Sequence, residues 1–344
     1  MKEALYYNKL DKDTVQCVLC PHECRLRPGQ MGICSVRQNI DGKLVTHVYN
    51  RAIAVHVDPI EKKPLFHVAP GSRSFSMAAM GCNFHCKFCQ NSSISQVDTI
   101  EIIQRNSETI TAAQLVEAAK QQHCRSIAYT YTEPTIYYEY AIECAELAHQ
   151  AGLLNIFVSN GYINPEPLEQ ISPVLDAANI DLKSFREDFY RKLVGAKLNP
   201  VLDTLRLMKS LKIFVEITTL IIPTHNDSED ELHDIARFIK QEMGEETPWH
   251  ISRFYPQYKL TNIPPTPPET LRRARDIGLA EGLKYVYTGN VPGDSGESTW
   301  CPQCGELVIQ RYGYSINKIN LKNGCCAKCQ TRINGIEMDA NNDN

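Results

Sequence analysis

Short apolar runs rich in β-branched residues alternate with segments of helical period through the middle of the chain. Runs of this kind are typical of strands buried on both faces of a parallel sheet. We expect such strands at residues 74–80, 126–131, 155–159, 178–183, 213–220 and 249–255, with a seventh at 284–288. A strand that alternates with a helix at this spacing predicts a sheet built from βα units.

The helical segments carry their own start signals. Thr111 and Gln114 have the spacing of a capping box, and Pro200 suits the first turn of a helix. An acidic first turn, DSED, suits the helix dipole. Further helices are expected at residues 135–150, 199–210, 227–243 and 267–282.

Six or seven βα units without an obvious GxGxxG favour an α/β fold with a full or partial TIM-type barrel over a Rossmann sheet. Barrel active sites lie at the carboxyl ends of the strands, so the polar residues of interest should follow the strands. They do, at Cys82, residues 130–134, residues 159–161, residues 181–183, Glu216, Thr218 and Arg253. The pattern predicts a site at one mouth of the barrel.

Composition narrows the class of protein. The net charge is −4 over 344 residues, so no basic excess indicates nucleic-acid binding. No apolar stretch is long enough for a membrane span, and the N-terminus lacks the apolar run of a signal peptide, so we expect a cytoplasmic protein. Fourteen cysteines then indicate metal sites more than disulfides. The isolated Cys124 and Cys144 are expected to be packed core thiols.

The central cysteines, Cys82, Cys86 and Cys89, have the spacing Cys-x3-Cys-x2-Cys. Three thiolates can hold three irons of a [4Fe–4S] cluster and leave the fourth iron open to a substrate or cofactor. One alternative is zinc with His85 as the fourth ligand, and another borrows a cysteine from the N-terminal group. A ferredoxin-type cluster or a structural zinc site would use four cysteines.

This loop, with an aromatic residue before its last cysteine, resembles the signature of radical SAM (S-adenosylmethionine) enzymes. Other stretches resemble the pyruvate formate-lyase activating enzyme branch, and most of all the radical SAM enzymes of the AmmeMemoRadiSam system. They are CVLCPHECRLRPGQMGICSVR at 17–37, AYTYTEPTIYYEY at 128–140, VSNGYI at 158–163, NIDLKSF at 179–185, HISRFYPQY at 250–258 and TWCPQCG at 299–305. The resemblance covers nearly the whole chain and implies a partial (β/α)6 TIM-like barrel.

The resemblance also implies an activity. In such enzymes the open iron binds SAM, an electron cleaves SAM to methionine and a 5′-deoxyadenosyl radical, and the radical abstracts hydrogen from a substrate. The substrate is not implied. One narrower hypothesis is an activase of a glycyl-radical partner protein. The C-terminal cysteine module argues against it, because simple activating enzymes do not need such a module. A hypothesis of another class is a non-catalytic iron–sulfur or zinc protein for electron transfer or scaffolding. The implied partners are SAM and an electron donor such as flavodoxin or ferredoxin.

By resemblance, Glu133 contacts the SAM amino group, although Tyr131 and Thr132 stand where relatives carry two glycines. The alternative is a carboxylate that stabilises a helix N-terminus. Asp181 and Lys183 share one face of a strand. The resemblance implies that this lysine meets the SAM carboxylate and that the aspartate gives polar support or a cation site, whereas the alternative is an inward salt bridge.

Ser159 and Asn160 resemble an element that lies near SAM, but Val158 stands where activating enzymes can carry an aspartate for a monovalent cation. His250 and Arg253 lie on a strand from which relatives reach the SAM ribose or the substrate. The arginine suits a carboxylate or phosphate. A contact at the barrel bottom or surface is the alternative for His250.

Two cysteine groups flank the barrel. The C-terminal one has the spacing of a zinc ribbon and includes Cys301, Cys304, Cys326 and Cys329. Cys325 could replace its neighbour, and rubredoxin-like iron is the second choice of metal. The N-terminal one includes Cys17, Cys20, Cys24 and Cys34. It fits zinc or an auxiliary [4Fe–4S] cluster, with a slight preference for zinc and with His22 as a competing ligand.

The expected organisation has four parts. A cysteine-rich lobe occupies residues 1–70 and the barrel residues 71–297. A zinc-ribbon-like module occupies 298–337, and a disordered tail 338–344.

Overall fold

A computed structural model describes residues 1–97 and 99–339. Its centre is an eight-stranded sheet in the order β16-β15-β14-β13-β12-β11-β9-β8. The seven strands from β16 to β9 in this order run parallel, and β8 is an antiparallel edge strand beside β9. The strands are β8 (Ala54–Pro59), β9 (Arg73–Ala78), β11 (Ser126–Tyr129), β12 (Leu154–Ser159), β13 (Ala177–Asp181), β14 (Phe214–Ile221), β15 (Trp249–Arg253) and β16 (Val286–Gly289). Within the described residues β8 and β16 do not pair with each other, so the barrel is partial, as expected.

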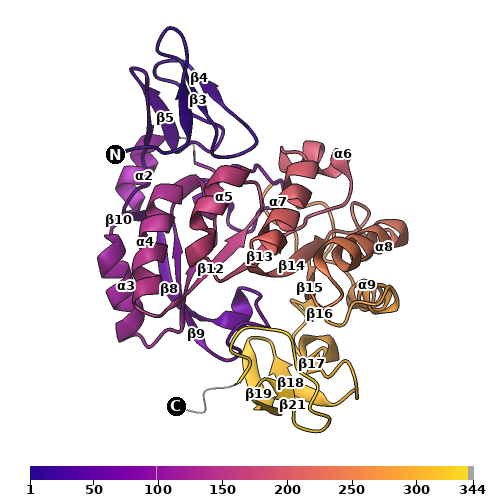
Figure 1. Cartoon of the computed structure of the whole chain (residues 1–344). Coiled ribbons are helices and arrows are strands. Elements are labelled where there is room, and N and C mark those ends of the chain that lie inside the picture. The colour runs from indigo at the N-terminus through magenta and orange to yellow at the C-terminus, as the bar shows by residue number, and fades with distance from the viewer. Residues whose placement is uncertain (98, 340–344) are drawn as a thin grey trace.

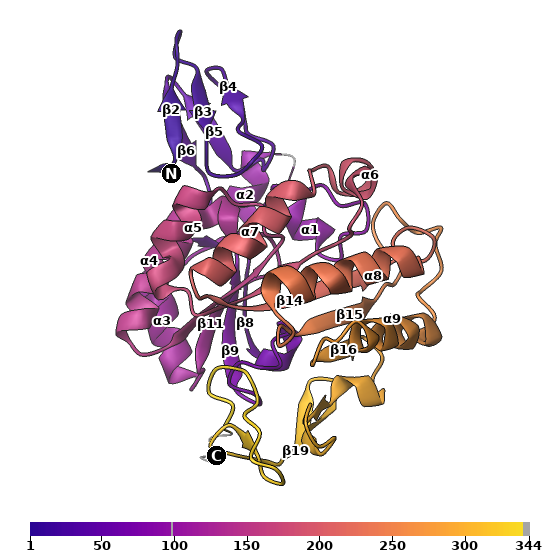
Figure 2. The same cartoon turned by 45° about the vertical axis from the view of Figure 1, so that its right-hand side comes forward.

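Helices cover the outer face of the curved sheet (Figures 1 and 2). They are α1 (Ser92–Ser95), α2 (Ile100–Asn106), α3 (Ala112–Gln121), α4 (Tyr138–Gln150), α5 (Pro165–Ile171), α6 (Glu187–Phe189), α7 (Asn199–Ser210), α8 (Glu229–Phe238) and α9 (Pro268–Ala280). Short 3-10 turns are η1 (Ile60–Lys62), η2 (Pro134–Tyr137), η3 (Ser172–Val174) and η6 (Ser295–Glu297), and π-helical turns are η4 (Tyr190–Val194) and η5 (Ile239–Met243). The expected capping box at Thr111 and Gln114 opens α3.

The N-terminal lobe forms two small antiparallel sheets at one end of the barrel (Figure 1). Its strands are β1 (Lys2–Glu3), β2 (Tyr7–Lys9), β3 (Val15–Cys17), β4 (Arg25–Leu26), β5 (Arg37–Ile40) and β6 (Lys43–Thr46), and β7 (Arg51–Ala52) pairs with β10 (Glu108–Thr109) outside the lobe. A buried ion pair between Arg37 and Glu139 joins the lobe to α4. The same carboxylate accepts a hydrogen bond of 2.7 Å from the Leu5 amide.

The boundary expected at residue 70 falls inside the barrel. β8 pairs with β9 along its whole length, and the segment after β8 fills the barrel interior. There the amides of Phe66 and His67 donate to the carboxylate of Glu216 at 3.0 and 2.7 Å, and Asn179 Nδ2 donates to the Pro64 carbonyl at 2.8 Å. These contacts are long-range, so local sequence pattern does not reveal them.

The C-terminal module packs against the opposite end of the barrel from the N-terminal lobe (Figure 1). Its strands are β17 (Thr299–Trp300), β18 (Leu307–Tyr312), β19 (Ser315–Ile319), β20 (Leu321–Lys322) and β21 (Cys325–Cys326). Met338 is buried against this module and Asp339 accepts a hydrogen bond from the Gly324 amide, so the ordered chain extends into the expected tail. Residues 340–344 of that tail lie outside the described residues.

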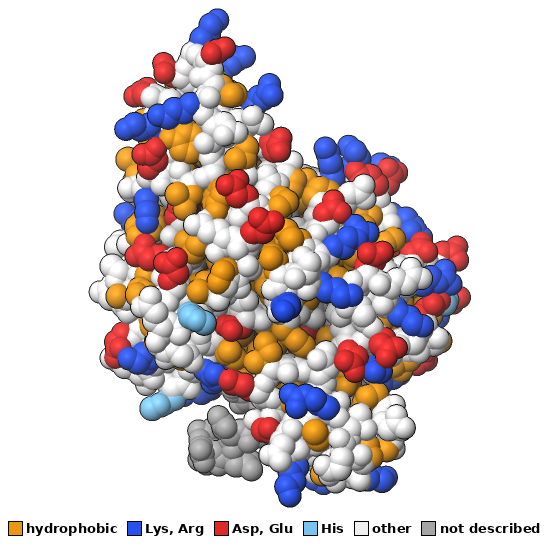
Figure 3. Space-filling view, viewed as in Figure 1, with side chains coloured by type: hydrophobic (Ala, Val, Ile, Leu, Met, Phe, Trp, Pro, Cys, Tyr) orange, Lys and Arg blue, Asp and Glu red, His pale blue; other side chains and the backbone are white. Residues whose placement is uncertain are grey.

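Acidic and basic side chains are interspersed on the face shown in Figure 3. In the part of the chain that the structure describes, no helix combines the length and the apolar character needed to cross a membrane. Cys124 and Cys144 are buried in the core, as expected for packed thiols.

Candidate active site

A cavity of about 490 Å³ lies at the carboxyl ends of the barrel strands. Ligand sites typically measure about 300–1,000 Å³, so a nucleoside cofactor fits a space of this size. The cavity brings together eight of the nine residues that the sequence assigned to the cluster and SAM. They are Cys82, Cys86, Cys89, Glu133, Ser159, Asn160, Asp181 and Lys183.

The cysteine loop leaves β9 through Gly81, whose φ is +101°. A Cβ at this position would stand 2.5 Å from Val36 Cγ1 and 2.8 Å from the Cys34 carbonyl oxygen, so only glycine fits this approach. Farther along the loop, the Lys87 amide donates to the Leu193 carbonyl at 2.9 Å. The loop is therefore fixed between the N-terminal lobe and the turn η4.

Polar groups contact the sulfur atoms of the loop. The Phe84 amide donates to Cys82 Sγ at 3.3 Å, and Ser95 Oγ lies 3.2 Å from Cys89 Sγ. Burial raises the pKa of Cys86 to about 12 and the pKa of Cys82 well above its usual value. These two thiols are thus protonated in the metal-free protein, and metal binding must displace their protons.

The loop sulfurs are not gathered as closely as the ligands of a zinc ion. Tetrahedral zinc with bonds of about 2.3 Å holds its sulfur ligands about 3.8 Å apart. Within the described residues, only the C-terminal cysteines form a group of three or more ligand atoms that all lie within 4.8 Å of one another. At least one pair of the three loop sulfurs is therefore more than 4.8 Å apart. His85 does not line the cavity, because its Nδ1 pairs with Gln96 Oε1 at 2.7 Å.

Glu133 joins the ends of two strands. One carboxylate oxygen accepts hydrogen bonds from the Thr135 amide, the Thr135 hydroxyl and the Ser159 hydroxyl, at 3.0, 2.7 and 2.8 Å. The other oxygen accepts from the Asn160 amide at 2.8 Å. Burial raises the pKa of Glu133, and the hydrogen bonds oppose that rise. The carboxylate caps η2, as the alternative interpretation held, and it also lines the cavity.

Asn160 connects this network to the cysteine loop. Its Nδ2 donates to Asn83 Oδ1 at 2.8 Å and lies 3.8 Å from Cys82 Sγ. Its Oδ1 accepts from the Tyr162 amide at 2.9 Å, which fixes the orientation of the amide. The loop after β12 therefore contacts the cysteine loop directly at Cys82.

Asp181 and Lys183 face the cavity together, and Lys183 Nζ lies 3.0 Å from Asp181 Oδ2. Burial opposes the charge on this lysine, but Asp181 and the Cys86 sulfur outweigh burial and raise the pKa of Lys183. The ammonium group thus stays charged beside the cysteine loop. It can bind a carboxylate without a change in protonation.

Arg253, the ninth residue, does not line the cavity. Its Nε donates to the Thr266 carbonyl at 2.7 Å, and its guanidinium lies over the Tyr255 ring. Side chains alternate along a strand, and on β15 it is His250 and Ser252 that face the cavity. The cofactor role expected for Arg253 is therefore not supported by its position.

The sequence assigned no specific contact to some other lining residues. Tyr131 has a φ of +62°, a left-handed conformation that a glycine would adopt more easily. Its hydroxyl donates to Asp58, which also binds Lys63 Nζ at 2.5 Å. Tyr131 and Lys63 both line the cavity, as does Tyr314 from the turn between β18 and β19. A tyrosine at a position where relatives carry glycine was a sequence signal that Tyr131 contributes to the cavity wall. No sequence signal indicated that the C-terminal module contributes Tyr314.

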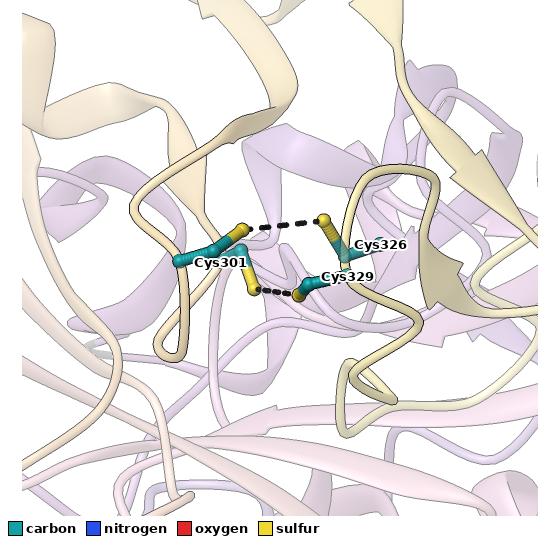
Figure 4. A group of neighbouring side chains, drawn as sticks. Cys301, Cys326 and Cys329 are labelled. Carbon is teal, nitrogen blue, oxygen red and sulfur yellow. Dashed lines mark hydrogen bonds between the residues drawn. The ribbon is translucent and has the colours of Figure 1, made fainter.

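The C-terminal cysteines form a compact group (Figure 4). Cys301 Sγ lies 3.5 Å from Cys329 Sγ, and Cys304 Sγ lies 3.8 Å from Cys326 Sγ. These distances match those expected around a tetrahedral metal ion. Cys325 is excluded from the group, and its sulfur points to the Asn323 carbonyl at 3.5 Å.

Comparison with known proteins places this site in a family. The model of the radical SAM superfamily matches residues 79–239, which contain the cysteine loop and its surrounding strands. The chain belongs to the radical SAM superfamily. Its relatives include the pyruvate formate-lyase 1-activating enzyme of Escherichia coli, which is 22% identical over 236 residues, or 63% of this chain and 93% of that enzyme. Within the superfamily the chain lies in the branch of that activating enzyme.

An uncharacterized protein of Methanocaldococcus jannaschii is 49% identical over 321 residues, which cover 93% of this chain and 95% of that protein. A crystal structure of a radical SAM methyltransferase from Sphaerobacter thermophilus has the same fold, with a TM-score of 0.51 and 15% identity. That match covers 66% of this chain and 70% of the other. Membership of the superfamily implies a [4Fe–4S] cluster, SAM and an enzymatic function.

Proposed function

We propose that Cys82, Cys86 and Cys89 hold the [4Fe–4S] cluster and that SAM binds beside it in the same cavity. The observation that carries this proposal is the convergence of three widely spread thiols with an acidic and a basic group on the walls of one cavity. Together the cluster and SAM supply a 5′-deoxyadenosyl radical, which takes a hydrogen atom from the substrate. The residues of the chain bind and orient these groups.

The acidic Glu133 and the basic Lys183 suit the amino group and the carboxylate of the methionine part of SAM. One carboxylate oxygen of Glu133 accepts a single hydrogen bond, from the Asn160 amide. This oxygen can therefore accept a second hydrogen bond from the amino group of SAM. Lys183 offers its ammonium group to the SAM carboxylate. Asp181 holds this ammonium group in place. Ser159 and Asn160 fix the orientation of Glu133.

The remaining walls are proposed to contact the substrate. Lys62, Lys63 and Tyr131 line one part of the cavity, and Gly313 and Tyr314 of the C-terminal module line another. Because this module forms part of the wall, it takes part in selecting what enters the cavity. The two lysines share one aspartate, and Glu61 lines the cavity beside them, so this part of the wall is rich in charged groups.

We further propose zinc as the metal of the C-terminal site, because four thiolates at tetrahedral distances suit zinc. The reductant is proposed to be a one-electron donor such as flavodoxin or ferredoxin. All fourteen cysteines are unpaired, which is consistent with a reducing cytosol.

The test is anaerobic reconstitution followed by addition of dithionite and SAM. We expect 5′-deoxyadenosine from the wild-type chain and none from Cys86→Ala, whose central cluster lacks one ligand. Cys325→Ser is the matched control, because this cysteine lies outside all three groups, and it should form product. Absence of product from wild-type protein with a spectroscopically intact cluster would contradict the proposed catalysis.

The second candidate is a glycyl-radical activase. It is favoured by the match to the E. coli activating enzyme, which extends over 93% of that enzyme. This candidate predicts that deuterium from the backbone glycine of a partner protein appears in 5′-deoxyadenosine. Label that comes instead from a small-molecule extract would exclude the activase.

A further inference from the structure

The N-terminal lobe contains a second cavity lined by cysteine, separate from the one described above. All four cysteines of the lobe border it. Cys17 ends β3 and Cys34 precedes β5, with Cys20 and Cys24 between them. The rest of the lining comprises the polar residues His22, Arg37, Asn83 and Thr135 and the non-polar residues Leu19, Gly32, Ile33 and Ile136.

The spread of these sulfur atoms distinguishes between metals. A zinc ion holds four sulfurs about 3.8 Å apart, and the C-terminal cysteines stand at that separation in the same molecule. Among the described residues, no three of the N-terminal sulfurs all lie within 4.8 Å of one another. The central loop, which lies in the segment matched by the radical SAM model, likewise does not bring its three sulfurs within 4.8 Å of one another. In this respect the N-terminal group resembles the cluster loop and not the C-terminal site.

A buried hydrogen-bond donor reaches one of these sulfur atoms, as suits a thiolate ligand. Arg37 is fully buried and borders the cavity, and its Nη1 lies 3.6 Å from Cys17 Sγ. Gly32 lies beside two of the cysteines, since a Cβ there would stand in ordinary van der Waals contact at 3.9 Å from Cys24 Sγ and 3.7 Å from Cys34 Sγ.

The cavity adjoins the loop that carries the SAM cluster. The Cys34 carbonyl lies against Gly81. Asn83 borders the N-terminal cavity and hydrogen-bonds Asn160, whose Nδ2 also lies 3.8 Å from Cys82 Sγ. One short stretch of backbone thus touches both cysteine groups.

We propose that Cys17, Cys20, Cys24 and Cys34 hold a second [4Fe–4S] cluster, next to the first. Four protein thiolates leave no iron open, so this cluster does not bind SAM. The proposal does not rest on the function proposed above, since a second cluster can be present whatever the substrate is.

The test removes the first cluster from the full-length chain. The triple variant Cys82→Ala/Cys86→Ala/Cys89→Ala is reconstituted anaerobically with iron and sulfide, and its iron and zinc are measured. We expect about four iron atoms per chain and a [4Fe–4S] Mössbauer signature. Zinc bound at the lobe in place of iron, or neither metal there, overturns the proposal. Adding Cys20→Ala should remove the remaining iron, while adding Cys325→Ser should leave it.

A measurement on the wild-type chain does not depend on whether these variants fold. Reconstituted protein should contain about eight iron atoms per chain. On addition of SAM, only one cluster should change its Mössbauer spectrum, because the other is fully ligated by cysteine. About four iron atoms per chain, all in a cluster that responds to SAM, overturn the proposal.

Discussion

Replacing Arg311 with methionine is expected to loosen the C-terminal module from the barrel. The Arg311 side chain is fully buried and makes a buried ionic contact between the two parts, whereas the Arg125–Glu337 pair between them is partly exposed. Its Nη1 donates to Thr299 Oγ1 at 2.7 Å within the module, and its Nη2 donates to the Phe66 carbonyl of the barrel at 2.8 Å. Its Nε lies 3.7 Å from a carboxylate oxygen of Glu61, which is also fully buried.

The size of the stability loss follows from the unpaired Glu61 carboxylate that the substitution leaves buried. Methionine fills much of the arginine volume but leaves Glu61 buried without a cation, and breaking a buried pair in this way costs about 3–5 kcal/mol. Burial raises the pKa of Glu61, and Arg311 opposes that rise. In the variant the folded-state pKa rises further above the unfolded value, so the variant loses stability as pH rises. Its deficit should therefore shrink at acidic pH, where Glu61 is protonated.

The two tryptophans allow the parts to be followed separately during urea unfolding. Trp249 is buried in the barrel, while Trp300 lies in the module and is 39% exposed. In a Trp249→Phe background, Arg311→Met should lower the free energy of unfolding reported by Trp300. The double variant Glu61→Gln/Arg311→Met removes both charges and should recover most of the loss. A cost below about 1 kcal/mol, or a double variant no more stable than the single one, would refute the reasoning.

Three further outcomes are expected. Gly81→Ala should cost more than about 2 kcal/mol in urea unfolding, because it combines a positive φ with contacts below 3 Å; an unchanged unfolding midpoint would contradict this. Glu133→Gln should weaken SAM binding about 10- to 100-fold by calorimetry on cluster-loaded protein, which corresponds to about 1.4–2.8 kcal/mol; equal affinity would remove Glu133 from the SAM site. Cys304→Ser should lose the C-terminal metal, measured as zinc per chain, whereas Cys325→Ser should retain it.

Much of the fold follows from local pattern. The seven parallel strands are found within one or two residues of the expected runs, because strands buried on both faces read as continuous apolar segments. The capping box at Thr111 fixes the start of α3 for a local reason as well. β8 was missed because it is an antiparallel edge strand whose pairing with β9 is not encoded by an α/β alternation.

The sequence predicts a site residue well when that residue lies at the end of a strand. It does not predict which face of a strand points into the cavity. Asp181 and Lys183 are two residues apart, which in a strand predicts one face for both; β13 ends at Asp181, but Lys183 just beyond it still lines the same cavity. For Arg253 the sequence predicts the strand but not which of its two faces points inward, and the inward face carries His250. Tyr314 reaches the cavity from a module more than a hundred residues beyond Lys183 in the chain, a contact that only the folded arrangement creates.

The choice of metal is likewise a property of the folded chain. The N-terminal and C-terminal groups both contain a Cys-x2-Cys pair, and such a pair occurs in zinc sites as well as iron–sulfur sites. In the C-terminal module two such pairs face each other, which brings four sulfurs to tetrahedral distances. In the N-terminal lobe a strand end and the loops between β3 and β5 hold the sulfurs around a wider cavity. In both proposals the spacing along the chain supplies the ligands, and the separation of the sulfur atoms in the folded chain distinguishes zinc from an iron–sulfur cluster.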